Sequence, residues 1–201
     1  MVPGRFSPRA KVIIVLCCIL IAVACVLFYS GYTAQAEERR HYIQLHLQKV
    51  AGQMADKVNG DGLLSLQPGD EGSPAYLALA GALYESRRND SFISGAYIMR
   101  VDNGTISYVI HDAYLVNGTD PAVARIGDLV TEDRDVIMNA TVSGPVYSPQ
   151  IYTSRWGSFL SGYAPVRDSR GTVVGVLGVD ETADTIASYE TYRFFNLVEV
   201  M

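Results

Sequence analysis

Two side chains near the C-terminal end could hold a small molecule without reacting with it. The stretch from Trp156 to Asp180 reads WGSFLSGYAPVRDSRGTVVGVLGVD. It places a phenol, Tyr163, inside one apolar run and a lone carboxylate, Asp180, at the end of the next. A phenol can donate or accept a hydrogen bond, and an ionised carboxylate accepts several. On a recessed face of a sheet, these two groups predict a cup for a small molecule.

The rest of the chain offers no arrangement typical of catalysis. The three histidines, His41, His46 and His111, make neither an H-E-x-x-H motif nor a triad-like set. The run GVLGVD lacks the G-x-G-x-x-G pattern of dinucleotide sites. The acidic run TEDRD at Thr131–Asp135 could bind calcium, but solvated surface charge is the simpler interpretation. The sequence therefore predicts a protein that is not an enzyme and that uses no cofactor and no metal.

The strands that carry Tyr163 and Asp180 are expected to pair as a hairpin, Phe159–Arg167 with Thr172–Asp180, across a polar turn. Alternate residues of a strand point to opposite faces. In the last strand, one face carries Val173, Gly175, Leu177 and Val179, and the other carries Val174, Val176, Gly178 and Asp180. Both faces are apolar, so both must be covered. The glycines leave room for a packed helix or for a ligand.

Further elements complete an α+β domain with an antiparallel sheet. After the N-terminal region, Ile43, Leu47, Val50, Met54 and Val58 form one apolar stripe of a long helix that Asn59-Gly60 would end. A second helix is expected at PAYLALAGALYES with Ser73 as its N-cap, and a hairpin around Asp102-Asn103-Gly104. Short helices are expected near Ile126–Asn139 and over Thr182–Phe195.

The N-terminal region predicts a membrane anchor. From Val12 to Tyr29 the chain has no charged residue. At about 1.5 Å per residue, a helix over 12–33 can cross a hydrocarbon core of about 30 Å. Arg5, Arg9 and Lys11 precede it, which places the N-terminus in the cytoplasm. The alternative is a signal peptide cleaved near the small-residue run Ala34–Ala36.

The composition after the anchor fits an extracytoplasmic domain. All three cysteines lie inside the apolar segment, so the outer part can form neither a disulfide nor a thiol-based site. The outer part carries all 21 acidic residues against 13 of the 16 basic ones, which argues against nucleic acid as a partner. Four N-x-[ST] sequences are candidate glycosylation sites, at Asn89, Asn103, Asn117 and Asn139.

These features divide the chain into four parts. We expect a cytoplasmic basic N-terminus (1–11), a transmembrane helix (12–33), an extracytoplasmic domain (34–190) and a C-terminal stub (191–201). The exposed face of the long helix can pair with a second subunit, which would make a homodimer.

The part of the chain after the predicted membrane helix resembles the extracellular Cache (PAS-like, PDC-type) sensor domains of bacterial and archaeal transmembrane receptors. The pattern W-G-x-x-x-S-G-Y-A-P-x-x-D followed by G-x-x-x-G-V-x-G-V-D carries the resemblance. The segments LLSLQPGDEGSPAYLALAGAL and AYIMRVDNGTISYVIHD precede it in the order seen in that family. The resemblance covers roughly residues 37–189. It implies a single Cache module that binds a small organic ligand, often an amine, amino acid or carboxylate, on the membrane-distal side of its sheet.

The resemblance also implies roles for particular residues. Tyr163 matches a Tyr that lines the pocket, Asp180 matches an acid that pairs with a ligand ammonium in amine-binding members, and Tyr97 matches an aromatic of the first hairpin. Arg155 and Trp156 lie where pocket-wall residues are found. Unlike the amino-acid-receptor pattern, however, Arg155 and Trp156 are adjacent and no acid follows closely. This difference argues against specificity for amino acids.

Each of these residues also has a purely structural interpretation. Asp180 could cap the helix that follows it, because an acid before a helix satisfies free N–H groups. Tyr163 and Trp156 could be core residues, and Arg155 could be a solvated loop residue.

The sequence thus predicts a membrane-anchored extracytoplasmic sensor domain of a signal-transduction receptor. In full receptors of this family, movement passes through a second span to a cytoplasmic output domain. The sequence given ends in YRFFNLVEVM, which is too short to cross a bilayer. Two alternatives use the same fold: a structural or adhesive surface protein without a ligand, and a secreted solute binder.

Overall fold

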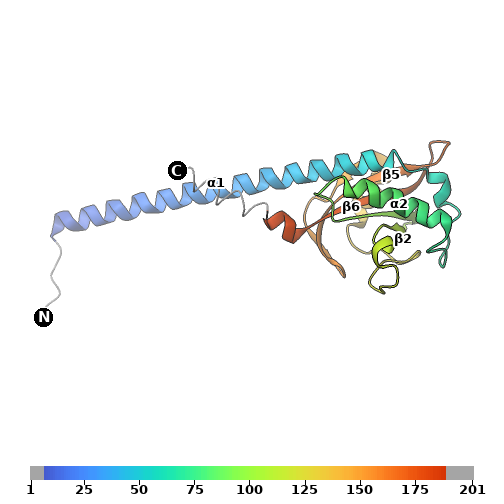
Figure 1. Cartoon of the computed structure of the whole chain (residues 1–201). Coiled ribbons are helices and arrows are strands. Elements are labelled where there is room, and N and C mark those ends of the chain that lie inside the picture. Colours follow the sequence, from blue (N-terminus) through green and yellow to red (C-terminus); the bar gives the residue numbers. More distant parts are fainter. Residues whose placement is uncertain (1–6, 189–201) are drawn as a thin grey trace. The chain divides into compact units, whose positions relative to one another are not determined.

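The computed structural model describes residues 7–188 of the 201-residue chain. Its helices are α1 (Pro8–Ala55), the 3-10 helix η1 (Gly60–Leu63), α2 (Pro74–Arg88), α3 (Tyr114–Asn117) and α4 (Arg134–Ser143). Its strands are β1 (Gly95–Asp102), β2 (Thr105–His111), β3 (Val146–Tyr147), β4 (Tyr152–Ser154), β5 (Gly157–Arg167) and β6 (Val173–Thr182). The chain divides into two compact units, Met1–His41 and Tyr42–Met201 (Figure 1).

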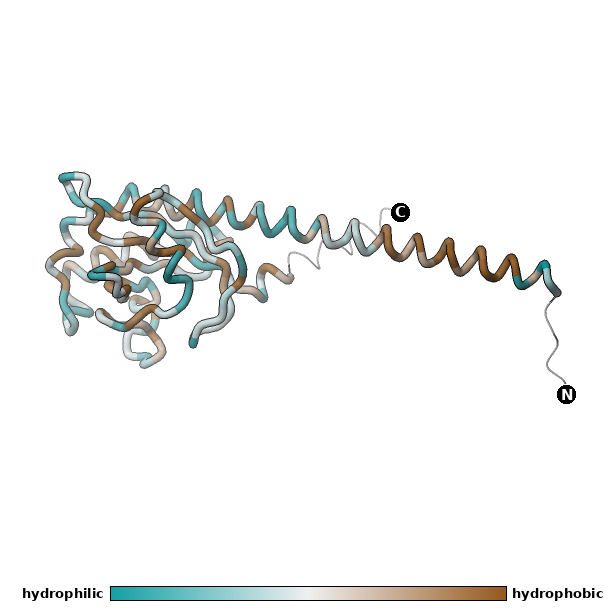
Figure 2. Tube along the Cα trace, turned by 180° about the vertical axis from the view of Figure 1, so that it is seen from behind, coloured by the Kyte–Doolittle hydropathy of each residue, from teal (hydrophilic) through white to brown (hydrophobic). Residues whose placement is uncertain are grey.

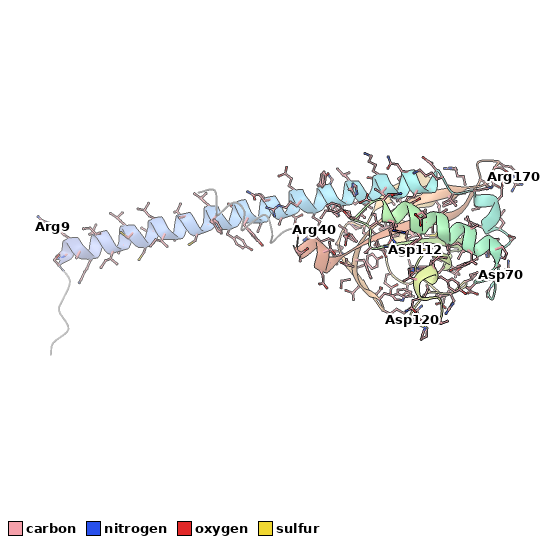
Figure 3. The ribbon with its side chains drawn as sticks, viewed as in Figure 1. Arg9, Arg40, Asp70, Asp112, Asp120 and Arg170 are labelled. Carbon is pink, nitrogen blue, oxygen red and sulfur yellow. The ribbon has the colours of Figure 1, made fainter. Side chains whose placement is uncertain are left out.

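The first unit holds the apolar part of α1. Within residues 7–188, α1 is the one helix long and apolar enough to cross a membrane, and its most apolar 18-residue stretch has a mean hydropathy of 3.3. None of that stretch is buried. Figure 2 shows the same stretch as one continuous hydrophobic run. Arg9 lies at the N-terminal end of the helix (Figure 3). By length and composition, this segment meets the requirements for a single membrane span.

The second unit is built on an antiparallel sheet, as expected. The strand order is β2-β1-β6-β5-β3, and β4 also pairs with β5. The two predicted hairpins are both present. Asn103 and Gly104 take φ values of 47° and 78° in the turn between β1 and β2, the conformation that Asn-Gly favours. Longer-range pairing then places β1 beside β6, so that Tyr97 lies opposite Gly178.

Helices α1 and α2 cover one face of this sheet (Figure 1). The expected apolar stripe of α1 is confirmed: Ile43, Leu47 and Met54 are buried, and Val50 and Val58 are packed against the same core. The odd-numbered face of β6 belongs to that core through Leu177 and Val179. The opposite face belongs to a second cluster that contains Val176 and Tyr163 together with Ile137 and Ala140 of α4.

Two glycines let these layers come close. A Cβ on Gly162 would lie 2.3 Å from the backbone carbonyl of Leu47, so α1 packs directly on the backbone of β5. A Cβ on Gly178 would lie 2.4 Å from the ring of Tyr97. One glycine therefore makes room for a helix, and the other makes room for an aromatic side chain of the protein itself.

Three helix boundaries differ from the sequence-based expectation. Helix α1 ends at Ala55, and the Asn59 side chain instead caps η1 by accepting from the N–H of Asp61. The helix expected over Ile126–Asn139 begins only at Arg134, because Gly127 has a φ of 95° and the preceding chain bridges to β2. Of the helix expected over 182–195, Thr182 is instead the last residue of β6, residues 183–188 are helical, and residues 189–195 lie outside the described residues.

The N-terminal start of α2 is confirmed. Ser73 has extended backbone angles, and its hydroxyl accepts from the N–H of Tyr76 at 3.3 Å. At the other end of α2, Arg87 forms an ion pair with Asp112, whose side chain is 1% exposed. Figure 3 shows Asp112 within the domain, whereas Asp70, Asp120 and Arg170 lie at its periphery. Helix α2 is therefore fixed to the sheet by a buried charge pair as well as by apolar contacts.

Candidate ligand-binding site

A cavity of about 210 Å³ lies on the sheet face opposite α1 and α2. It draws on β1, β2, β4, β5 and β6 and on the chain that leads into α4. Most of its lining is aromatic or apolar, with a few polar groups, as is typical of small-molecule sites. The lining residues are Ser94, Gly95, Tyr97, Tyr108, His111, Val130, Glu132, Ile137, Tyr152, Ser154, Trp156, Phe159, Tyr163, Asp180 and Thr182.

Asp180 forms the polar centre of this cavity. Its Oδ1 atom accepts a hydrogen bond from the Tyr97 hydroxyl at 2.7 Å and another from the Ser161 hydroxyl at 2.6 Å. Strand pairing places Asp180 between Gly95 and Ser161. Burial raises the pKa of Asp180 to about 6, although both hydroxyl donors oppose that rise. Two neutral donors thus orient the carboxylate, and among the described residues it forms no ion pair. The His111 imidazole is the neighbouring group whose positive charge would favour the ionised form of Asp180.

A row of hydroxyl groups continues from Asp180 across the cavity wall. The Tyr152 hydroxyl lies 2.9 Å from the Ser161 hydroxyl, and the Tyr163 hydroxyl oxygen lies 3.4 Å from that of Tyr152. Tyr163 also lies within hydrogen-bond distance of Asp133 Oδ2, at 3.1 Å. Burial, the largest influence, raises the pKa values of Tyr152 and Tyr163. These tyrosines therefore remain neutral and act as hydrogen-bonding groups rather than as bases.

Aromatic rings form another wall of the cavity. The Tyr97 ring stacks on His111 with 5.8 Å between centroids and meets Tyr108 edge-on at 5.4 Å. Tyr108 in turn meets Trp156 edge-on at 5.5 Å. The Trp156 indole N–H donates to the carbonyl of Ala122, which fixes the orientation of the ring. Such rings offer apolar contact together with a negative π face that attracts cations.

Four of the five candidate ligand-binding residues line this one cavity: Tyr97, Trp156, Tyr163 and Asp180. Arg155 is not in the lining. Its guanidinium lies 2.9 Å from Asp128 and 4.1 Å from the centre of the Trp156 ring, and its side chain is 58% exposed. The four candidate glycosylation residues, Asn89, Asn103, Asn117 and Asn139, are exposed on the surface.

Several lining residues were missed by reasoning from the sequence. His111 was not identified because its position depends on a bulge in the first hairpin, whereas Tyr108 keeps the regular register opposite Met99. Regular pairing from the Asn-Gly turn would place Tyr97 opposite Ile110, but an irregularity after Ile98 places it opposite His111. For Tyr108 a signal was available: regular pairing from the Asn-Gly turn places it opposite Met99, on the same face of the sheet as Tyr97.

Tyr152, Glu132 and Asp133 were missed for a different reason. They lie in irregular chain or in very short strands, where no period predicts orientation. Asp133 belongs to the run TEDRD, which was interpreted as solvated charge. The structure instead places it half-buried at a φ of 52°, where its carboxylate accepts from Ser148 and the nearby Tyr163. Burial raises its pKa.

The charges of the lining indicate which ligands fit. Asp180 and Glu132 are acidic, His111 is the one residue of the lining that could become cationic, and the lining contains neither Lys nor Arg. A ligand carboxylate would meet two acids and, as a compensating charge, only the His111 imidazole, which already lies 3.5 Å from Asp112. An ammonium would meet a carboxylate and several aromatic faces. The site suits a cation.

No protein-family model and no curated protein matches the chain significantly. Among solved structures, the E. coli DcuS sensor domain matches with a TM-score of 0.50 and 16% identity, over 75% of this chain and 96% of that one. An extracellular ligand-binding receptor from Desulfohalobium retbaense matches with a TM-score of 0.51 and 17% identity, over 78% of this chain and 25% of that one.

The ligand-binding domain of the Campylobacter jejuni chemoreceptor Tlp3, in complex with 4-methylisoleucine, matches 78% of this chain with 14% identity and a TM-score of 0.48. This chain spans 56% of the length of that domain. At identities of this size, the likeness concerns the fold. The chain has the fold of extracytoplasmic sensor and ligand-binding domains, the fold that its resemblance to the Cache family implies.

Proposed function

We propose that this chain is the sensing part of a membrane-anchored receptor and that its cavity binds a small organic amine. The observation that carries the proposal is the Asp180 carboxylate, which lies on an aromatic cavity and forms no ion pair with a Lys, Arg or His among the described residues. Burying a charge without a partner is costly, and the pKa of Asp180 reflects that cost. A bound ammonium would supply the missing charge.

The lining favours an amine over an amino acid or a carboxylate. An amino acid would need a cationic partner for its carboxylate. Arg155, the basic residue that the sequence analysis expected in the pocket wall, is paired with Asp128. The tyrosine hydroxyls can orient polar groups of the ligand, but they do not neutralise an anion.

Strand β5 offers a physical route for the signal. Tyr163 lines the cavity, and the residue before it, Gly162, lies against the backbone of α1 at Leu47. A ligand that shifts Tyr163 or Asp180 would therefore shift the surface on which α1 packs. The size of that effect is limited by the difference in ligand affinity between the two states.

The remaining parts of the proposal concern the membrane and the partner subunit. Residues 12–33 would span the bilayer, with residues 1–11 in the cytoplasm and residues 34–190 outside, because Arg9 and Lys11 flank the N-terminal side of the span. Tyr42 and Leu45 of α1 are 68% and 45% exposed. This apolar exposure would suit pairing with a second copy of the chain.

The amine proposal can be tested by isothermal titration calorimetry on the full chain in detergent. Short primary alkylamines and matched alkylcarboxylates would be titrated into the wild type, into Asp180→Asn and into Asp135→Asn. Asp135 is an exposed acid in the first turn of α4, so it gives the same charge change outside the cavity. We expect amines alone to bind, and only Asp180→Asn to abolish that binding.

Two results would contradict the proposal. Binding of carboxylates in preference to amines would mean that the charge of the lining does not select the ligand. Failure of every compound to bind a well-folded chain would favour the alternative of a surface protein that uses the fold without a ligand. A folded state can be checked by circular dichroism before each titration.

A further inference from the structure

A second carboxylate lines the same cavity and is not used by the contacts described so far. Glu132 lies in the short segment between Val130 and α4, and Val130 and Ile137 line the cavity beside it. The described polar contact of its carboxylate is a hydrogen bond from the backbone N–H of Thr131, at 3.2 Å. Within residues 7–188, no Lys, Arg or His lies at ion-pair distance from it.

Tyr108 lies within the electrostatic influence of both cavity carboxylates. Burial is the main reason why the pKa of Tyr108 is raised, and Asp180 and Glu132 are the next contributions in the same direction. The ring of Tyr108 also contacts Tyr97 and Trp156. One aromatic wall is thus shared by two acidic groups that come from different parts of the chain.

The lining therefore holds two carboxylates and neither Lys nor Arg, and its one imidazole, that of His111, lies 3.5 Å from another acid, Asp112. A ligand with a single ammonium would compensate one of them and would leave the other half-buried beside an apolar molecule. Such an uncompensated charge costs more when water is displaced from around it. A ligand with two cationic groups would compensate both carboxylates.

We infer that the ligand carries two positive charges: a short aliphatic diamine with one ammonium at Asp180 and the other at Glu132. Its methylene chain would lie along the rings of Tyr108 and Trp156, which provide apolar contact and cation–π attraction for the ends. This inference rests on the proposed function and names the substrate class of the same site.

A divalent metal ion fits the two carboxylates less well than an organic dication. Among the described residues, no three His, Cys, Asp or Glu side chains gather closely enough to hold a metal ion. The walls between the acids are aromatic, whereas Ca²⁺ and Mg²⁺ require six or more oxygen ligands. The apolar walls match a carbon chain.

The test compares diamines with monoamines of the same chain length on the full chain in detergent. Calorimetric titrations would use 1,3-diaminopropane, 1,4-diaminobutane and 1,5-diaminopentane against propylamine, butylamine and pentylamine. Because a second charge-assisted contact is gained, we expect at least one diamine to bind about tenfold or more tightly than its monoamine. Glu132→Gln should remove that preference and keep the monoamine affinity, whereas Asp135→Asn should leave both unchanged.

The outcomes separate this inference from the proposal on which it rests. If monoamines bind and diamines bind no more tightly, or if the preference survives in Glu132→Gln, then the inference is wrong and the amine site stands. If neither monoamines nor diamines bind the folded wild-type chain, both the amine proposal and the diamine inference are wrong. If Ca²⁺ or Mg²⁺ binds the wild type, if Glu132→Gln removes that binding, and if no diamine binds more tightly than its monoamine, the two carboxylates serve a metal and the inference is overturned.

Discussion

Asp180 is subject to two opposing influences. Burial favours the neutral acid, while the hydroxyls of Ser161 and Tyr97 donate to the charged form and favour it. Burial prevails, so the pKa is raised from 3.8 to about 6. By linkage, this shift makes the folded state less stable above pH 6, by at most about 3 kcal/mol from this one group. The site thus holds a charge that the empty fold would be more stable without.

The pH dependence of ligand binding and of stability should follow from this pKa. Lowering the pH below 6 protonates Asp180, so the affinity for an amine should fall roughly tenfold per pH unit. Above pH 6, Asp180→Asn should be more stable than the wild type, because it keeps an oxygen acceptor for Ser161 and Tyr97 without the charge. That gain should shrink as the pH approaches 4.

Calorimetry at several pH values and urea unfolding of both proteins would measure these effects. Comparing the two proteins at each pH cancels the contribution of other acids, such as Asp112, whose pKa is lowered because its hydrogen bonds and ion pair outweigh burial. An amine affinity that stays constant from pH 8 to pH 5 would contradict the assignment of Asp180 as the partner of the ammonium.

At the scale of elements, β5 connects the cavity to the long helix. Its successive residues face opposite sides: Tyr163 lines the cavity, and Gly162 receives the backbone of α1. The same alternation places Ser161 beside Asp180. A strand of small residues can thus bring a ligand and a helix close to each other through one backbone.

Gly162→Ala should separate α1 from β5. The added methyl group would lie 2.3 Å from the carbonyl of Leu47, and backbone atoms cannot rotate away as a side chain can. We expect a loss of about 1–3 kcal/mol in the free energy of unfolding. Gly81→Ala in α2 is the matched control, because nothing lies within 4 Å of its Cβ and alanine favours a helix.

Urea unfolding followed by circular dichroism would measure both variants. Equal stability of Gly162→Ala and Gly81→Ala would show that the contact between α1 and β5 is looser than the structure has it. A loss of stability in Gly162→Ala alone would support β5 as the strand on which α1 packs.

At the scale of the whole molecule, the hydrophobic run of α1 and the folded domain differ in what covers their apolar surface. The domain buries its apolar residues on both faces of one sheet, whereas the apolar stretch of α1 is not covered by any described residue. Surface of that length and hydropathy is long and apolar enough to span a lipid bilayer.

The chain should therefore remain in the membrane fraction of cells. Washing with sodium carbonate should not release it, whereas detergent should, and mass spectrometry should find an N-terminus before residue 12. An N-terminus close to residue 37, with the protein in the soluble fraction, would instead identify the apolar run as a cleaved signal peptide and the domain as a secreted binder.

Local features of the sequence determined much of the architecture. The Asn103-Gly104 turn, the Ser73 cap and the apolar stripe of α1 were predicted correctly, because turn geometry, capping and periodicity depend on residues a few positions apart. Alternation along β6 correctly gave the two faces from Val176 to Asp180, but Val174, expected on the face of Val176, packs against the core cluster of Leu177 and Val179. The α+β class followed from the order of these elements.

Tertiary structure decided which side chains share the cavity. The space above Gly178 is filled by Tyr97, a residue 81 positions away in the chain, because β1 pairs with β6. A bulge brought His111 into the lining, and irregular chain brought Glu132. Arg155, expected in the pocket wall, pairs instead with Asp128. These outcomes depend on contacts between distant segments, and no pattern within a single segment records which distant partner its side chains will meet.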